Sequence, residues 1–191
     1  VVFLSDNGMN CGHHGIWGKG NGTRPQNIFD SSVKVPCLVA QPGRIAPGVS
    51  DALLSGYDVF PTLLDYLDIA DVPARQRPGK SFRALLDGRA SAGDDAVVVY
   101  DEYGPVRMVR TREWKYVHRY PDGPHELYDL SNDAGERRNV VDDAAYRATA
   151  ARLRARLAEW FACYVDPALD GADKRVTGCG QLGLTPAEGD G

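Results

Sequence analysis

One glycine-rich stretch of the sequence holds the residues that could carry chemistry. The segment SDNGMNCGHHGIWGKG, residues 5–20, follows the apolar run VVFL and opens with an acid and an amide side by side, Asp6 and Asn7. A carboxylate and an amide oxygen at the carboxyl end of a parallel strand can bind one hard cation. Oxygen donors without a thiolate favour calcium or magnesium over zinc. The same residues also suit a simple turn, because Asp, Asn and Gly are turn residues.

A lysine and two histidines follow in the same stretch. Lys19 lies between Gly18 and Gly20, so the backbone can come close to whatever the ammonium group contacts. This cation could hold an anionic group that also contacts the metal, or it could be exposed and solvated, as most lysines are. The adjacent His13 and His14 could be metal ligands, proton donors, anion contacts or structural groups.

Composition limits the class of protein. The chain has 191 residues, 43% of them apolar, which is enough for a sizeable core. Its net charge of −4 and the lack of a basic run with interleaved aromatic residues argue against a nucleic-acid partner. The apolar runs are too short to span a bilayer. Because the first residue already lies in an apparent strand, we interpret the chain as the C-terminal part of a longer protein and leave its compartment open.

The four cysteines give no metal motif. They lack C-x-x-C spacing, so a structural zinc site is not expected. Cys163 and Cys179 are close enough in sequence to form a disulfide, but free thiols are equally compatible with the spacing.

The first half of the chain predicts alternating strands and helices. The apolar runs at 1–5 and 35–43 predict two buried strands, the first of them central and covered on both faces. Helical spacing at 55–69 predicts a helix with Asp58 as its N-cap, and a shorter helix is expected at 80–88. This order of elements predicts an α/β fold.

The second half predicts a small sheet and one long helix. Four strand-like runs, VVVYDEY, VRMVRT, WKYVHRY and HELYDL, follow one another at short spacing and predict a four-stranded antiparallel sheet, with PDGP as a turn between the last two. Residues 143–164 carry an apolar stripe at helical spacing, which predicts a helix packed on that sheet.

Basic side chains on these strands have two interpretations. They could face a substrate mouth and attract an anion, but we favour a solvated sheet face balanced by acids, because long charged side chains are usually exposed. The residues concerned are Arg107, Arg110, Arg112, Lys115 and His118, with Glu102, Glu113 and Asp129 as the acids. Trp114 and Tyr116 are interpreted as core. Trp17, in the glycine-rich stretch, is either a contact for an apolar or sugar group or a packing residue.

In this order, FLSDNG, GHHGIWGKG and SVKVPCLVAQPGRI resemble the C-terminal half of the catalytic domain of type I sulfatases, arylsulfatase-like enzymes of the alkaline phosphatase superfamily. Residues 55–88 resemble the helical segment that follows in those enzymes, and residues 106–140 are similar to their small C-terminal subdomain. The resemblance implies an α/β, alkaline phosphatase-like fold followed by the antiparallel sheet and its helix. The expected division is 1–90 for the catalytic part, 97–165 for the subdomain and 166–191 for a tail.

The resemblance also implies roles for individual residues. Asp6 and Asn7 match the acid and amide that bind the active-site divalent cation, Ca²⁺ or alternatively Mg²⁺. Lys19 matches the lysine that contacts the sulfate, and His14 matches a histidine near the leaving group. His13 stands where many relatives carry an acid, so it is interpreted, with Trp17, as a substrate-binding residue.

The activity that the resemblance implies is hydrolysis of sulfate esters, with a sulfated small molecule or glycan as substrate. Type I sulfatases use a formylglycine nucleophile made from Cys or Ser in a C-x-P-S-R-like motif, and none of the four cysteines has that context. The nucleophile and further metal-binding acids are therefore expected in a missing N-terminal half, without which the chain is inactive. The alternatives are a phosphonate or phosphate ester hydrolase of the same superfamily, a non-catalytic anion- or glycan-binding fragment, and a degenerate protein without function.

Overall fold

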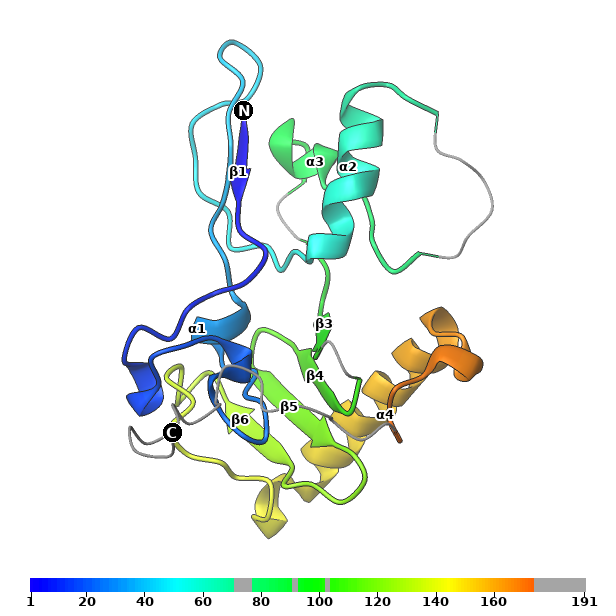
Figure 1. Ribbon diagram of the computed structural model, residues 1–191. Coiled ribbons are helices and arrows are strands. Elements are labelled where there is room, and N and C mark those ends of the chain that lie inside the picture. Colours follow the sequence, from blue (N-terminus) through cyan, green and yellow to red (C-terminus); the bar gives the residue numbers. More distant parts are fainter. Residues whose placement is uncertain (71–76, 91–92, 102–103, 174–191) are drawn as a thin grey trace, which may run out of the picture.

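The computed structural model describes residues 1–70, 77–90, 93–101 and 104–173. Figure 1 shows a part with β1, α2 and α3 above, a four-stranded sheet with α4 below, and α1 near the junction. The upper part holds β1 (Val2–Leu4), β2 (Cys37–Val39), α2 (Val59–Tyr66) and α3 (Arg83–Leu86), and α1 spans Asp30–Val33. The lower part holds β3 (Val97–Tyr100), β4 (Val106–Arg110), β5 (Trp114–Arg119), β6 (Glu126–Asp129) and α4 (Arg147–Tyr164). Single 3-10 turns cover His13–Gly15, Gly20–Gly22, Gly56–Asp58, Ala144–Tyr146 and Pro167–Leu169.

The strands β1 and β2 form where the apolar runs predict them, but their surroundings differ from the prediction. They pair antiparallel with each other, with Phe3 opposite Leu38. Within the described residues β1 has no parallel neighbour, so the expected parallel pairing stays a prediction. Burial on both faces is wrong for the described residues, since Phe3 and Leu38 are 58% and 60% exposed. The physical reason is that an apolar run specifies a strand, whereas its burial depends on layers from elsewhere. The described residues supply such a layer on one face only, from α2 and α3.

The helix α2 lies within the predicted segment, but its cap differs. Ser55, not Asp58, caps the turn that leads into it, because the Ser55 hydroxyl accepts a hydrogen bond from the backbone N–H of Tyr57. The Asp58 carboxylate instead accepts from the backbone N–H groups of Ser55, at 2.7 Å, and Lys80, at 2.9 Å. The acid therefore ties the start of α2 to the segment before α3, a link between distant residues that local spacing does not reveal.

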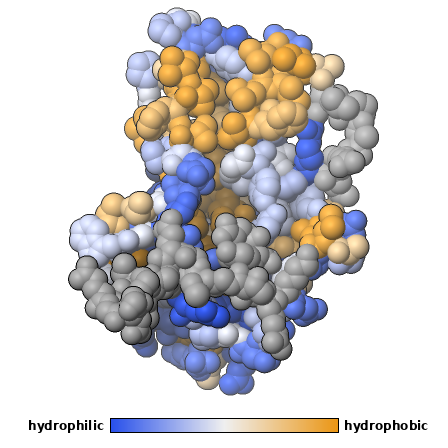
Figure 2. Space-filling view, viewed as in Figure 1, coloured by the Kyte–Doolittle hydropathy of each residue, from blue (hydrophilic) through white to orange (hydrophobic). Residues whose placement is uncertain are grey.

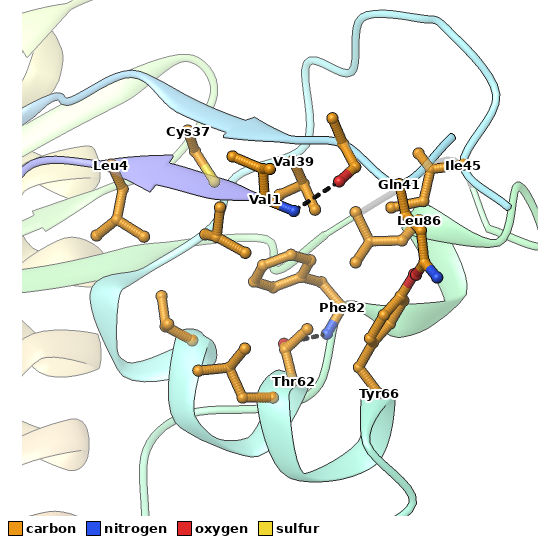
Figure 3. A pocket seen from close by; sticks show the side chains of 14 residues that line it. Val1, Leu4, Cys37, Val39, Gln41, Ile45, Thr62, Tyr66, Phe82 and Leu86 are labelled. Atoms are coloured by element: carbon orange, nitrogen blue, oxygen red, sulfur yellow. Dashed lines mark hydrogen bonds between the residues drawn. The ribbon is translucent and has the colours of Figure 1, made fainter. Parts of the chain in front are cut away.

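Between the two-stranded sheet and these helices lies a cavity of about 100 Å³ (Figure 3). Its walls are largely apolar and include Val1, Leu4, Val39, Ile45, Phe82 and Leu86. The backbone N–H of Phe82 donates to Thr62 Oγ1 at 2.9 Å, which fixes the segment leading into α3 against α2. None of the predicted site residues lines this cavity, so it is a gap in an apolar packing layer and not the predicted active site.

The four-stranded sheet and α4 confirm the prediction for the second half of the chain. The strand order is β3-β4-β5-β6, all neighbours are antiparallel, and a turn at 120–122 connects the last two. One face of the sheet packs on α4 through a core of Val98, Val109, Tyr116, Leu127, Leu153, Leu157 and Phe161. Asp143 caps the 3-10 turn before α4, with its carboxylate accepting from the backbone N–H of Ala145.

The opposite face of the sheet is covered by residues 28–33, so the sheet has no solvated face where these residues lie. Ile28 packs with Val106, Met108 and Val117 in a second apolar cluster. Lys115, whose side chain is fully buried, lies among them. The prediction of a solvated basic face is therefore wrong for this lysine.

Two acids accompany the buried Lys115 ammonium group. Its Nζ lies 2.5 Å from the Asp30 carboxylate and also pairs with Glu136. Arg110 forms a further ion pair with Asp30, at 3.1 Å. Burial acts to raise the pKa of Asp30, but the charges of Lys115 and Arg110 outweigh it and hold that pKa below its usual value. This cluster binds α1 to the sheet.

Two more of the basic residues are buried on the α4 side. Arg107 pairs with Asp170 and lies over the Phe161 ring, and His118 accepts a hydrogen bond from Tyr116 or donates one to it, at 2.9 Å. Arg112 and Glu113 are exposed, as predicted, and Trp114 and Tyr116 pack on the core, as predicted. Glu102 lies outside the described residues. Covering layers on both faces of the sheet thus bury charges that residue type alone assigned to solvent.

Exposed apolar side chains gather on the upper part of the molecule (Figure 2). They come from β1, β2, α2 and the residues next to these elements, and include Val1, Phe3, Leu38, Phe60, Leu63 and Leu67. No helix in the described ranges has the length and apolar character needed to cross a membrane. Of the predicted tail, residues 166–173 are described, and Cys179 lies outside the described residues.

Candidate active site

The loop between β1 and α1 begins with a tight turn that presents Asp6. The Asp6 carboxylate is exposed and accepts hydrogen bonds from the backbone N–H of Asn7, at 2.9 Å, and from the Ser5 hydroxyl, at 3.3 Å. The backbone N–H of Gly8 donates to the carbonyl of Ser32 at 2.9 Å. A Cβ atom at Gly8 would lie 2.3 Å from a backbone carbonyl oxygen of α1, so only glycine allows this close approach. The turn is thereby fixed against α1.

The structure brings Lys19 back to this turn. Lys19 Nζ donates a hydrogen bond to Asn7 Oδ1 at 2.9 Å, and both side chains are half-buried. The Asn7 amide nitrogen in turn donates to the carbonyl of Gly8 at 2.8 Å, which orients its oxygen toward the lysine. An ammonium group has three protons to donate, and this contact uses one of them. Among the predicted site residues, Asp6, Asn7 and Lys19 therefore share one location.

The two histidines and Trp17 lie on the exposed part of the same loop. The His14 ring stacks on Phe29, with ring centroids 3.7 Å apart and 6° between the planes. His14 has a φ of 56°, a left-handed conformation that is uncommon outside glycine. His13 is exposed, and Trp17 is 86% exposed with its indole edge against Gly12. Among the described residues, no hydrogen bond or ring contact joins these three side chains to Lys19.

The oxygen atoms at this turn suit part of a cation site. The Asp6 carboxylate and the neighbouring Asn7 amide are oxygen donors of the type that Ca²⁺ and Mg²⁺ bind, and the carboxylate is open to solvent. Across the described residues, no three or more His, Cys, Asp and Glu side chains are grouped so that they could hold a metal ion. The two residues therefore fit as a partial ligand set that needs further oxygen atoms.

Sequence reasoning left Asn10 without a role and did not consider Asn27 or Ser32. Asn10 is fully buried, and Asn27 and Ser32 are nearly so. The Ser32 hydroxyl accepts from Asn10 Nδ2 at 2.7 Å and donates to Asn27 Oδ1 at 2.5 Å. An asparagine within a glycine-rich loop, Asn10, is the one sequence signal that could have pointed to this network, since an amide needs hydrogen-bond partners wherever it is buried.

The chain also matches known proteins along most of its length. Residues 12–162 match the family model described as N-sulphoglucosamine sulphohydrolase, C-terminal. The chain belongs to the sulfatase family. Its predicted alkaline phosphatase-like fold agrees with the solved sulfatase structures that it resembles.

Three proteins to which the chain is similar differ in the substrates or activities that their names state. The choline-sulfatase of Rhizobium meliloti is 32% identical over 168 residues, which cover 84% of this sulfatase chain and 31% of the relative. A structure solved in complex with its substrate D-glucosamine-2-N,6-O-disulfate is 25% identical with a TM-score of 0.75, covering 91% of this chain and 36% of the other. The phosphonate monoester hydrolase of Agrobacterium radiobacter is 29% identical with a TM-score of 0.70, covering 88% of this chain and 36% of the other.

The sulfatase chain therefore spans about a third of the length of these proteins. Sulfatases of this family generally use a metal ion and a formylglycine. The described residues contain a partial oxygen ligand set, from Asp6 and Asn7, and a lysine beside it.

Proposed function

We propose that this chain is the C-terminal part of an enzyme that hydrolyses sulfate esters of small molecules or glycans. The observation that carries the proposal is the contact of Lys19 Nζ with Asn7 Oδ1, next to the exposed carboxylate of Asp6, in a chain of the sulfatase family. At this turn the ammonium group of Lys19 can bind an anion, and the open carboxylate of Asp6 can bind a metal ion. Such a site suits an ester whose sulfuryl oxygens are anionic.

Each loop residue has a proposed part in the reaction. Lys19 donates hydrogen bonds to the sulfuryl oxygens and stabilises the negative charge that grows on them. His14 gives a proton to the oxygen of the departing alcohol. His13 and Trp17 contact the rest of the substrate, with the exposed indole suited to an apolar or sugar face. The attacking formylglycine belongs to the proposed N-terminal half of the protein, which is the principal partner of this chain.

Asp6 and Asn7 are proposed to bind the divalent cation, with Ca²⁺ favoured over Mg²⁺. When bound, a divalent cation polarises the sulfuryl oxygens as a Lewis acid. Ca²⁺ takes six to eight oxygen ligands, so the proposed N-terminal half must supply the acids that complete its shell. We also propose the division of the chain into residues 1–90, 97–165 and 166–191, with the second block supporting the first.

The decisive test replaces Lys19 with alanine in the full-length protein. Removing one preorganised charge partner of the transition state typically lowers kcat by about 10²–10³-fold. Lys19→Ala is therefore expected to lower kcat for an aryl sulfate by that factor with the fold retained, as judged by circular dichroism. Lys34→Ala is the matched control, because Lys34 is an exposed lysine next to α1. Turnover by Lys19→Ala close to that of the wild type would refute the role of Lys19.

Metal dependence tests Asp6 separately. Chelation with EDTA is expected to abolish turnover, and Ca²⁺ is expected to restore it at lower concentration than Mg²⁺. Asp6→Ala should raise the Ca²⁺ concentration needed for half-maximal activity, because it removes a charged ligand. Calorimetry with Ca²⁺ measures the same loss without turnover. Full activity after exhaustive chelation would contradict the metal assignment.

A second candidate is the hydrolysis of phosphonate or phosphate esters. It is favoured by the similarity to the phosphonate monoester hydrolase, which the chain matches about as well as it matches a solved sulfatase structure. Comparing kcat/KM for an aryl sulfate and an aryl phosphonate distinguishes the two. Binding of sulfated sugar without turnover and without a metal requirement would instead indicate a non-catalytic binding fragment.

A further inference from the structure

Two buried asparagines hold the backbone on both sides of Lys19. The backbone N–H and the Nδ2 of Asn10 both donate to the carbonyl of Gly18, each at 2.9 Å. The backbone N–H of Asn27 donates to the carbonyl of Gly20 at 3.0 Å. Asn27 Nδ2 lies 3.2 Å from the carbonyl oxygens of both Lys19 and Gly20. Three consecutive carbonyl groups, from residue 18 to residue 20, are thus bound by these two side chains and their backbones.

Ser32 connects the two asparagines. Its hydroxyl accepts from Asn10 Nδ2 at 2.7 Å and donates to Asn27 Oδ1 at 2.5 Å. The hydroxyl of Ser31 donates to Asn10 Oδ1, also at 2.5 Å. The carbonyl of Ser32 accepts the backbone N–H of Gly8, so the same helix turn also fixes the segment that carries Asp6 and Asn7. The segment with Asp6 and Asn7 and the segment with Lys19 are therefore both held in place by contacts with α1.

The helix α1 is itself fixed to the four-stranded sheet. Asp30, its first residue, pairs with the buried Lys115, and the backbone N–H of Asp30 donates to Glu136 at 2.6 Å. Arg119 of β5 donates to the carbonyl of Gln26, just before α1, at 3.1 Å. A continuous set of buried polar contacts therefore runs from the sheet through α1 to the backbone of Lys19.

Lys19 needs such support because of its position. It has glycines on both sides, and glycine leaves the backbone more freedom than any other residue. Its side chain also has several rotatable bonds, whose ordering costs up to about 2 kcal/mol. A displacement of about 1 Å in a catalytic group can lower a rate by about 10²-fold. An ammonium group on this segment can act precisely only if its backbone is fixed by contacts from elsewhere.

We propose that Asn10, Asn27 and Ser32 are positioning residues for Lys19, and that Ser32 couples the two asparagines. This inference rests on the proposed function, because it requires that Lys19 contacts the reacting sulfuryl group. The network touches the backbone of Lys19 and not its ammonium group, so it acts on the geometry of the site and contributes no charge to it.

The test is a double-mutant cycle in the full-length protein, with Ser32→Ala and Lys19→Ala made singly and together. Ser32→Ala removes the hydroxyl that joins the two asparagines and is expected to lower kcat for an aryl sulfate by about 10–10²-fold, with a smaller change in KM. In the Lys19→Ala background, the same change is expected to lower kcat by less than about twofold, because an interaction that acts through Lys19 is already lost there. The dissociation constant for inorganic sulfate, measured by calorimetry, should follow the same pattern.

Two further variants control the experiment. Asn21→Ala removes an amide of the same loop whose buried Oδ1 has no hydrogen-bond partner among the described residues, so it should leave kcat unchanged within about twofold. Asn27→Ser removes the Nδ2 contacts to the carbonyls of residues 19 and 20 but keeps a hydroxyl near Ser32. It tests the same coupling if Ser32→Ala does not fold, which thermal unfolding of each variant shows.

The outcomes separate the inference from the function on which it rests. If the wild-type protein neither hydrolyses an aryl sulfate nor binds inorganic sulfate, the proposed function is wrong and the inference is wrong with it. If Lys19→Ala impairs the enzyme and Ser32→Ala lowers kcat by equal factors in both backgrounds, the function stands and the positioning role is overturned. Loss of the Ser32→Ala effect in the Lys19→Ala background, with Asn21→Ala near wild type, supports the inference.

Discussion

The two sheets of this chain are built from similar apolar runs and have different surroundings. The strand β3 carries Val98, which is 7% exposed, whereas β1 carries Phe3, which is 58% exposed. The sheet of β3 has α4 on one face and residues 28–33 on the other. The sheet of β1 has α2 and α3 on one face, with a cavity between, and its other face carries Phe3 and Leu38 in contact with solvent.

This difference shows what a strand pattern specifies and what it leaves to the rest of the fold. Burying a large apolar side chain stabilises a fold by about 1.5–3 kcal/mol. The lower sheet gains this from its own chain, whereas the far face of β1 and β2 does not gain it from the described residues. The proposed active site lies at the end of β1 and is held by α1, which the lower sheet anchors. The well-packed lower sheet thus fixes, through α1, a site that begins at the end of the sparsely packed strand β1.

The largest expected loss of stability comes from removing the buried charge of Lys115, which joins α1 to the lower sheet. Lys115→Met keeps the volume and removes the ammonium group that pairs with Asp30 and Glu136. Leaving buried acids without their partner typically costs about 3–5 kcal/mol. Urea unfolding should show a loss of that size in the free energy of unfolding. Lys34→Met, at an exposed lysine, should change it by less than about 0.5 kcal/mol. Equal values for the two variants would refute the anchoring role.

The next prediction compares the loss of stability when a leucine is replaced by alanine in each of the two parts. Leu153→Ala, at a fully buried residue of α4, is expected to cost about 2–5 kcal/mol. Leu38→Ala, at a residue 60% exposed on β2, should cost less than about 0.5 kcal/mol in the 191-residue chain. Cover of this face by the proposed N-terminal half would raise the cost of Leu38→Ala to about 1.5–3 kcal/mol in the full-length protein. A small cost in both would argue against that cover.

Much of this fold could be predicted from local pattern. The four short strand runs, the turn between β5 and β6 and the apolar stripe of α4 each depend on neighbours in sequence, and all are confirmed. The glycine-rich loop after β1 was also recognisable, since its residue types are polar and its backbone is flexible. These features arise from hydrophobic periodicity and turn-forming residues, which can be identified in a single sequence.

The features that sequence could not predict depend on distant segments. The burial of Lys115 requires Asp30 and Glu136, which come from α1 and from the loop after β6. Similarly, Asn10 is identified as a structural centre only when Ser32 and Asn27 are placed beside it. The exposure of Phe3 depends on a layer that the described residues do not supply on that face. In each case the sequence specifies the side chain and the tertiary fold specifies its partners.

The smallest expected effect is on the pH dependence of stability, and it comes from a pair of histidines on the α4 side of the lower sheet. The ring of His118 stacks on that of His125, with centroids 4.2 Å apart, and its Nδ1 lies 2.9 Å from the Tyr116 hydroxyl. Burial, followed by the nearby His125, Arg154 and Arg107, lowers the pKa of His118 from 6.5 to about 4. Burial, followed by the nearby Arg154 and Arg119, also lowers the pKa of His125. Both rings are therefore held neutral in the folded protein.

This arrangement makes the lower part of the molecule sensitive to acid. In the unfolded chain His118 takes up a proton as the pH falls below 6.5, whereas in the folded chain it does so only near pH 4. Its contribution to stability is therefore fully present above pH 6.5 and is lost as the pH falls from 6.5 to about 4. His118→Asn keeps an acceptor for the Tyr116 hydroxyl and cannot be protonated in this range, so its free energy of unfolding should decline less steeply across that interval.

The measurement is urea unfolding of the wild type and of His118→Asn at several pH values between 4 and 6.5, since the carboxyl groups common to both proteins cancel in the difference. His13→Asn is the matched control, because the His13 side chain lies exposed on the loop between β1 and α1. Parallel curves for the wild type and His118→Asn would show that protonation of His118 does not couple to folding. The contrast between the two parts of the molecule would then rest on apolar burial and the Lys115 cluster alone.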